Sequence, residues 1–100
     1  MTTTNNEKVI KKFLEKEQAQ TPLRDIINGY YTYKGRTLYT IQSLSSYDIE
    51  LINYKTRIAY IDNNTLYINT KKYSSTTSKI QSKLKYLASL TSYDIVEYQE

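Results

Sequence analysis

The sequence predicts an α+β fold: an N-terminal helix, an antiparallel β-meander of about four or five strands, a C-terminal helix packed on the sheet, and a short final strand. Three observations carry this prediction. Apolar residues recur at helical spacing towards both ends of the chain, they alternate with polar residues in the middle, and turn-forming dipeptides separate the alternating runs. With 100 residues the chain is expected to be one domain, with residues 1–22 as N-terminal helix and linker and residues 23–98 as the sheet-plus-helix core.

The first predicted element is a helix from about Asn5 to Ala19. Thr4 and Glu7 have the spacing of a capping box, in which each side chain binds a free backbone N–H of the other residue. The apolar stripe of this helix is narrow and consists of Val9, Ile10, Phe13 and Leu14. Two roles fit such a stripe: docking on the chain's own sheet, or forming the interface of a homodimer or of a complex with a partner.

The middle of the chain is predicted to form strands separated by turns. Asn28-Gly29 is a turn signal, and Lys34-Gly35 can close a hairpin between two tyrosine-rich runs. Another strand is expected from Asp48 to Tyr54. Lys55-Thr56 is either a tight turn or a bend in one long strand from Ile49 to Ile61, and the pattern does not decide between the two.

The clearest local pattern is a hairpin around Asn63-Asn64. Asn tolerates the left-handed backbone, so this pair suits a two-residue type I′ turn with positive φ at both positions. The four apolar residues of the flanking strands then share one face, and two tyrosines meet on the other. The predicted cross-strand pairs are Asp62 with Thr65, Ile61 with Leu66, Tyr60 with Tyr67, and Ala59 with Ile68.

A second helix is predicted after Tyr73, with its N-cap between Ser74 and Thr76 because Ser and Thr side chains accept hydrogen bonds from the first turn. Lys79, Lys83 and Tyr86 lie at positions i, i+4 and i+7 and form a basic, aromatic face beside the apolar stripe. The stripe is expected to pack on the apolar face of the hairpin, and it consists of Ile80, Leu84, Leu87 and Ala88.

The last predicted element is a short edge strand with the apolar side chains of Ile95, Val96 and Tyr98. Glu97 and Glu100 lie among them. These two acids are expected to protect the edge against aggregation, because charge opposes strand-to-strand association.

The composition excludes several kinds of site. The chain has no Cys and no His, and therefore lacks thiolate metal ligands and the usual general base near neutral pH. Serines are numerous, but no His is present to activate them, and the acids are scattered; we expect no enzyme, no cofactor and no metal site. No apolar run has the ~20 residues of a membrane span and no signal peptide is evident, so a cytoplasmic protein without a membrane partner is expected.

Positive charge is concentrated near the predicted second helix. The net charge is +4, and five lysines and no acid lie between Lys71 and Lys85. A helix start that combines cations, free N–H groups and hydroxyls suits a phosphate, and tyrosines among lysines can stack on bases. The candidate residues for binding an anion, a nucleic acid or a partner surface are Lys71, Lys72, Ser74, Ser75, Thr76, Lys79, Lys83, Tyr86, Tyr60 and Tyr67.

Each of these features also has a purely structural explanation. The hydroxyls can cap the helix while the lysines are simply solvated, and cross-strand tyrosine pairs can shield the sheet. The twelve tyrosines, with one Phe and no Trp, are in part what an AT-rich genome would encode.

Two motifs carry a resemblance to known proteins: the strand IAYID from Ile58 to Asp62 and the helix start YSSTTSK from Tyr73 to Lys79. Together they resemble a short domain of phage, plasmid and other mobile-element proteins of Gram-positive bacteria, with a strand of the form SY-x-T-x-IAYID and a helix start of the form YS-x-TTSK. A His often follows the lysine in that pattern, but Ile80 stands here, so no role of that His carries over. The matching residues are Tyr54, Thr56, Ile58, Ala59, Tyr73, Ser74, Thr76, Thr77, Ser78 and Lys79.

The resemblance covers about a third of the chain and implies a genomic setting more than a mechanism. Small proteins of that setting regulate replication or transcription, or inhibit host defences as anti-CRISPR proteins do. The resemblance therefore implies a small accessory protein that binds and inhibits a host defence protein or nucleoprotein in the bacterial cytoplasm. The alternative is direct binding of DNA or RNA through phosphate contacts of residues 71–85. Because DNA mimics are acidic and this chain is basic, an inhibitor of this kind would contact the nucleic acid of an RNA-guided complex or an acidic protein patch.

Overall fold

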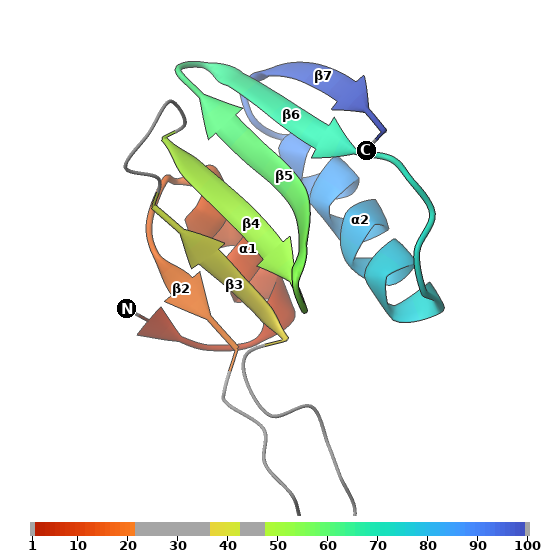
Figure 1. The fold of residues 1–100 in the computed structure, drawn as a ribbon. Coiled ribbons are helices and arrows are strands. Elements are labelled where there is room, and N and C mark those ends of the chain that lie inside the picture. The colour runs from red at the N-terminus through yellow and green to blue at the C-terminus, as the bar shows by residue number, and fades with distance from the viewer. Residues whose placement is uncertain (1, 22–36, 43–47, 100) are drawn as a thin grey trace, which may run out of the picture.

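The computed structural model describes residues 2–21, 37–42 and 48–99. Within these residues the fold is α+β, as predicted, and two helices cover one face of a seven-stranded sheet (Figure 1). The strands follow one another across the sheet in chain order. The expected turns at Asn28-Gly29 and Lys34-Gly35 lie outside the described residues.

The sheet is mixed. Strands β2 to β6 pair antiparallel with their neighbours, which confirms the predicted meander, whereas β1 pairs parallel with β2 and β7 pairs parallel with β6. The helices are α1 (Asn6–Leu14) and α2 (Ser75–Ala88). The strands are β1 (Thr2–Thr3), β2 (Ala19–Gln20), β3 (Leu38–Ile41), β4 (Ile49–Asn53), β5 (Thr56–Asp62), β6 (Thr65–Asn69) and β7 (Asp94–Tyr98).

The start of α1 differs from the prediction. Its N-cap is Asn5, whose Oδ1 accepts a hydrogen bond from the Lys8 N–H at 2.9 Å. Thr4 is not the cap, because its N–H donates to the Gln20 carbonyl at 2.9 Å and the chain is still extended beside β2. Glu7 does not reach back to the cap and instead forms ion pairs with lysine side chains.

The end of α1 also differs, since the helix stops at Leu14 and not near Ala19. Lys16 has a left-handed backbone, with φ of 60°, which ends the helical path. Ala19 is fully buried and pairs with Thr2, so the residues assigned to the last helical turns belong to the sheet.

The chain from Ile49 to Ile61 is two strands joined by a tight turn. Asn53 pairs with Thr56, so Tyr54 and Lys55 form the turn, and Tyr54 takes the left-handed conformation with φ of 59°. This result decides between the two alternatives that the sequence left open, with the turn one residue earlier than Lys55-Thr56.

The hairpin of β5 and β6 has the predicted register at all four residue pairs. Ala59, Ile61, Leu66 and Ile68 are buried on the helix side of the sheet. The turn differs in one respect: Asn63 has φ of 57°, but Asn64 does not have a positive φ, so the turn is not type I′.

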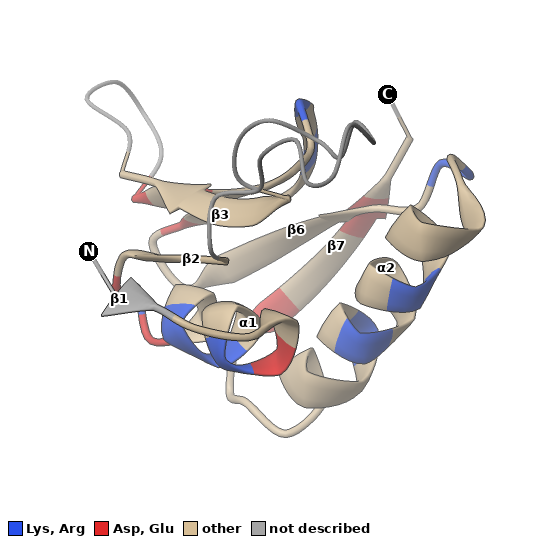
Figure 2. Ribbon diagram, turned by 90° about the horizontal axis from the view of Figure 1, so that it is seen from below, with Lys and Arg blue, Asp and Glu red and all other residues tan. Residues whose placement is uncertain are grey.

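One core fills the space between the sheet and the two helices, which lie on the same side of it (Figure 2). The predicted apolar stripes of both helices are buried in this core. The stripe of α1 therefore docks on its own sheet, and a homodimer through this helix, which stays a prediction, would have to use its polar face. Neither described helix is long and apolar enough to cross a membrane.

Candidate functional site

The candidate site is centred on the start of α2. Ser74 is the N-cap, within the predicted range, and its Oγ accepts the Thr77 N–H at 3.3 Å. Ser75 and Thr76 are exposed, and their N–H groups belong to the first turn, where no helical carbonyl is available to accept them. The first turn carries no acidic residue. This helix end therefore presents its partial positive charge to solvent.

A buried polar network fixes the loop that leads into α2. The side chain of Asn69 is fully buried; its Oδ1 accepts the Lys71 N–H at 3.0 Å, and its Nδ2 donates to Tyr73 Oη at 2.9 Å. The amide of Gln81 donates to the carbonyls of Asn69 and Lys71, at 2.8 and 3.0 Å. Since these bonds tie the loop both to β6 and to the second turn of α2, the backbone of Lys71 is held at a fixed place beside the helix start.

Two of the five lysines in the 71–85 segment form ion pairs with acids. Lys83 Nζ lies 3.3 Å from Glu7 Oε1 of α1, and Lys85 Nζ lies 2.8 Å from Glu97 Oε1 of β7. Both ion pairs join α2 to another element. These pairs are half-exposed, so each stabilises the fold only modestly, but each removes a free cation from the surface.

The other three lysines, Lys71, Lys72 and Lys79, are exposed and form no ion pair within residues 2–21, 37–42 and 48–99. Lys71 Nζ lies 5.6 Å from the centre of the Tyr73 ring, a cation–π contact that keeps its charge. Lys79 belongs to the second turn of α2, so all three lie near the helix start. Blue segments in Figure 2 mark basic residues in the loop before α2 and along the helix itself.

Lys55 is a cation that the sequence pattern did not assign to this site. It is exposed in the turn between β4 and β5, two residues after Asn53. Asn53 Oδ1 accepts a 2.6 Å hydrogen bond from the hydroxyl of Thr77, and this bond places the turn at the same end of the molecule as the start of α2. The sequence left open whether residues 49–61 form one bent strand or two strands joined by a tight turn. It therefore did not indicate that Lys55 lies in a turn at the same end of the molecule as the start of α2.

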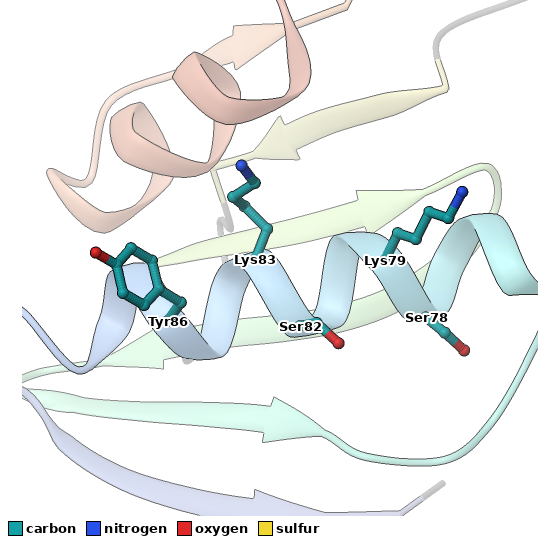
Figure 3. Close-up of a pocket in the computed structure, with 5 residues that line it drawn as sticks. All are labelled: Ser78, Lys79, Ser82, Lys83 and Tyr86. Atoms are coloured by element: carbon teal, nitrogen blue, oxygen red, sulfur yellow. The ribbon is translucent and has the colours of Figure 1, made fainter.

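Side chains on the face of α2 that points away from the core line a shallow depression of about 470 Å³. Figure 3 shows Lys79 and Lys83 on one side of the helix and Ser78 and Ser82 on the other, with Tyr86 towards the C-terminal end. Tyr86 is 64% exposed, an unusual value for an aromatic side chain. The predicted basic, aromatic face is therefore present, although one of its two lysines, Lys83, forms an ion pair with Glu7.

Tyr60 and Tyr67 lie on the other side of the sheet from α2 and do not join this surface. Their rings stack on each other, with centroids 4.6 Å apart and planes 12° apart. The Arg57 guanidinium lies 4.5 Å from the centre of the Tyr60 ring. Both faces of Tyr60 are thus covered within the protein, and this favours the structural explanation of the pair. Of the ten candidate residues, eight lie in α2 or in the loop before it. The other two, Tyr60 and Tyr67, lie on the opposite face of the sheet.

The described residues contain no group of three or more His, Cys, Asp or Glu side chains that could hold a metal ion. Comparisons of the chain with models of known families, with curated proteins and with solved structures found no match. Function is therefore inferred from the geometry of the chain's own residues.

Proposed function

We propose that this chain is a non-enzymatic binding protein that contacts nucleic-acid phosphates through Lys71, Lys72 and Lys79. The observation that carries the proposal is the division of the lysines into two groups. Lys83 and Lys85 are held by carboxylates, whereas the three lysines near the start of α2 have no acidic partner in the described part of the chain. Free cations gathered at one place favour a multiply charged anionic partner.

The helix start adds donors to these cations. Exposed Ser75 and Thr76 offer hydroxyls and first-turn N–H groups beside Lys71 and Lys72. The polar network around Asn69 holds the loop in place before any ligand arrives, so little conformational entropy is lost on binding. Exposed Tyr86, farther along the same helix, gives a stacking surface for a base of a single strand.

The test is fluorescence anisotropy with labelled single-stranded and double-stranded oligonucleotides at a series of salt concentrations. The proposal predicts an affinity that falls log-linearly with salt, because phosphate contacts release counterions. The matched control is Lys8→Glu, which makes the same change in net charge at an exposed lysine of α1 and should bind more tightly than Lys72→Glu. Absence of binding at low salt, or equal losses in the two variants, would contradict the proposal.

A second candidate function is inhibition of a host defence protein or nucleoprotein by a mobile-element accessory protein, in the manner of anti-CRISPR proteins. The resemblance of the 58–84 segment to mobile-element proteins supports it. So do Tyr86 and Leu90, which are 64% and 69% exposed, because exposed aromatic and apolar side chains are typical of protein interfaces. A purified RNA-guided nuclease assayed with and without the protein tests this function. Inhibition that persists at high salt and is lost in Tyr86→Ala would favour it; full cleavage at a large excess of protein would contradict it for the nuclease tested.

A further inference from the structure

One stripe of exposed side chains runs along α2 on the face that points away from the sheet. Its members lie at positions i, i+4, i+7 and i+11 of the helix and are Ser75, Lys79, Ser82 and Tyr86. Side chains at this spacing lie one above another along a helix. With a rise of ~1.5 Å per residue the stripe is about 17 Å long. It therefore offers an extended ligand a straight path that begins at the start of the helix.

Ion pairs border this stripe on both sides. Helical geometry places Lys83 on one flank, where its ammonium lies 3.3 Å from Glu7 of α1. Lys85 lies on the other flank, 2.8 Å from Glu97 of β7. Residues 75–88 include no acid, and Lys79 forms no ion pair within the described residues. The centre of the face thus keeps a positive charge, which an anionic ligand complements.

Tyr86 gives the C-terminal end of the stripe an aromatic ring that the fold does not use. Its side chain is 64% exposed, and in the described part of the chain no other aromatic ring packs on it. The ring lies at one end of the depression, with lysines along one side and serines along the other (Figure 3). Because every nucleobase has a flat aromatic face, such a ring suits base stacking.

We propose that the partner of this surface is a single-stranded nucleic acid, whose backbone follows the stripe and one of whose bases stacks on Tyr86. This inference rests on the proposed function and names the class of nucleic acid that the chain binds. Lys79 and the hydroxyls of Ser75 and Ser82 contact phosphates. At the ~3.4 Å spacing of a stacked strand, the stripe spans about five nucleotides, and about three lie between Lys79 and Tyr86.

A double helix fits this face less well. Inside a duplex each base is stacked between its neighbours, so no base face is available to Tyr86. The exposed side chains of α2 also include no Arg, Asn or Gln, which form bidentate contacts with base edges in the major groove. Gln81 is buried and donates to the carbonyls of Asn69 and Lys71. Phosphate contacts and stacking therefore remain, and little sequence preference is expected.

Three labelled probes test this assignment by fluorescence anisotropy: a single strand of about ten thymidine nucleotides, an abasic strand of the same length, and a duplex of the same length. The abasic strand carries the same phosphates but has no base to stack. We expect the thymidine strand to bind about tenfold more tightly than the abasic strand, and more tightly than the duplex. Equal affinities for the two single strands, or tighter binding of the duplex, would overturn the inference.

Variants at the C-terminal end of α2 test the stacking residue. Tyr86→Ala should weaken binding of the thymidine strand about tenfold and leave the salt slope unchanged, because no charge is lost. Tyr86→Phe keeps the ring and should bind like the unmodified chain. The matched control is Leu90→Ala, which removes another exposed apolar side chain and should have no effect. Circular dichroism should show all three variants folded. Equal binding by Tyr86→Ala and Leu90→Ala would contradict stacking on Tyr86.

The single-strand inference and the proposed function fail in different ways. If the three probes bind equally well and Lys72→Ala still lowers the salt slope, the phosphate contacts stand and the single-strand inference is wrong. If none of the probes binds at low salt, both are wrong.

Discussion

The hydroxyl of Thr77, in the first turn of α2, donates a 2.6 Å hydrogen bond to Oδ1 of Asn53, the last residue of β4. Both side chains are buried, with exposed fractions of 4% and 2%. The amide Nδ2 of Asn53 donates in turn to the Thr37 carbonyl at 2.8 Å. The side chain of Asn53 thus links the start of α2 to β4 and to the residue before β3. These two bonds fix the position of the helix start, and with it the position of the exposed lysines beside it.

Replacing Thr77 with Val keeps the shape of the side chain but leaves Asn53 Oδ1 buried without its donor. Because an unsatisfied buried acceptor is costly, we expect the free energy of unfolding to fall by about 1–3 kcal/mol. Urea denaturation measures this. The matched control, Thr76→Val, changes an exposed neighbour and should stay within about 0.5 kcal/mol. Equal effects of the two substitutions would show that the Thr77–Asn53 bond does not hold the helix start.

Leu84 is fully buried in the core between α2 and the sheet. Leu84→Ala removes buried methyl groups and leaves a cavity, so a loss of about 2–5 kcal/mol is expected in the same denaturation experiment. Ser82→Ala, on the exposed side of the same helix, is the control and should be close to neutral. A near-neutral Leu84→Ala would mean that the apolar stripe of α2 does not pack as described.

Lys72→Glu combined with Lys79→Glu should leave the fold intact. Both side chains are exposed and neither has an ion pair in the described residues, so the stability is expected to change by less than about 1 kcal/mol. Thermal unfolding followed by circular dichroism checks this. An unfolded double variant would mean that these lysines stabilise the structure, and any loss of binding would then say nothing about a binding surface.

The stability should depend on pH through Asp48. The hydrogen bond from Lys16 Nζ, 2.9 Å from Oδ2, is the main cause that holds the pKa of this carboxyl below its usual range. The Asn63 N–H also donates to Oδ2, at 3.1 Å, which ties the hairpin turn to the same carboxylate. The pKa of Asp48 is lower in the folded chain than in the unfolded chain. The stabilisation that the Lys16–Asp48 contact gives is therefore complete above the pKa of Asp in the unfolded chain. It is lost as the pH falls through the pKa of Asp48 in the folded chain.

The difference in melting temperature between the unmodified chain and Asp48→Asn should therefore be largest near neutral pH and shrink as the pH falls below 4. A difference that does not change with pH would argue against the Lys16–Asp48 contact.

Local patterns predicted the parts of the fold that local interactions determine. The Asn63-Asn64 turn and the alternation on both sides of it were enough to give the register of β5 and β6, and the hydroxyl cluster at Ser74 was enough to give the start of α2. The early end of α1 was missed, because a lysine with a left-handed backbone carries none of the sequence signal that a Gly would give.

Features that depend on distant residues could not be predicted in the same way. Nothing local indicates that β7 runs parallel to β6, or that Lys83 meets Glu7 76 positions earlier in the chain. The sequence indicated a basic segment correctly, but only the tertiary contacts divide its lysines into paired and unpaired. The buried amide of Asn69 was also missed, because the alternation along β6 puts it on the face of Thr65 and Tyr67, opposite the apolar Leu66 and Ile68, where no burial is expected.

Phosphate binding by Lys72 and Lys79 is tested most directly by comparing single lysine variants in the salt dependence of nucleic-acid binding. Removing one lysine that binds a phosphate should reduce the slope of log affinity against log salt by about one. This reduction is expected for Lys72→Ala and for Lys79→Ala, and little change is expected for Lys83→Ala, whose ammonium is already held by Glu7. Equal slopes for all three variants, or the largest change at Lys83, would contradict it.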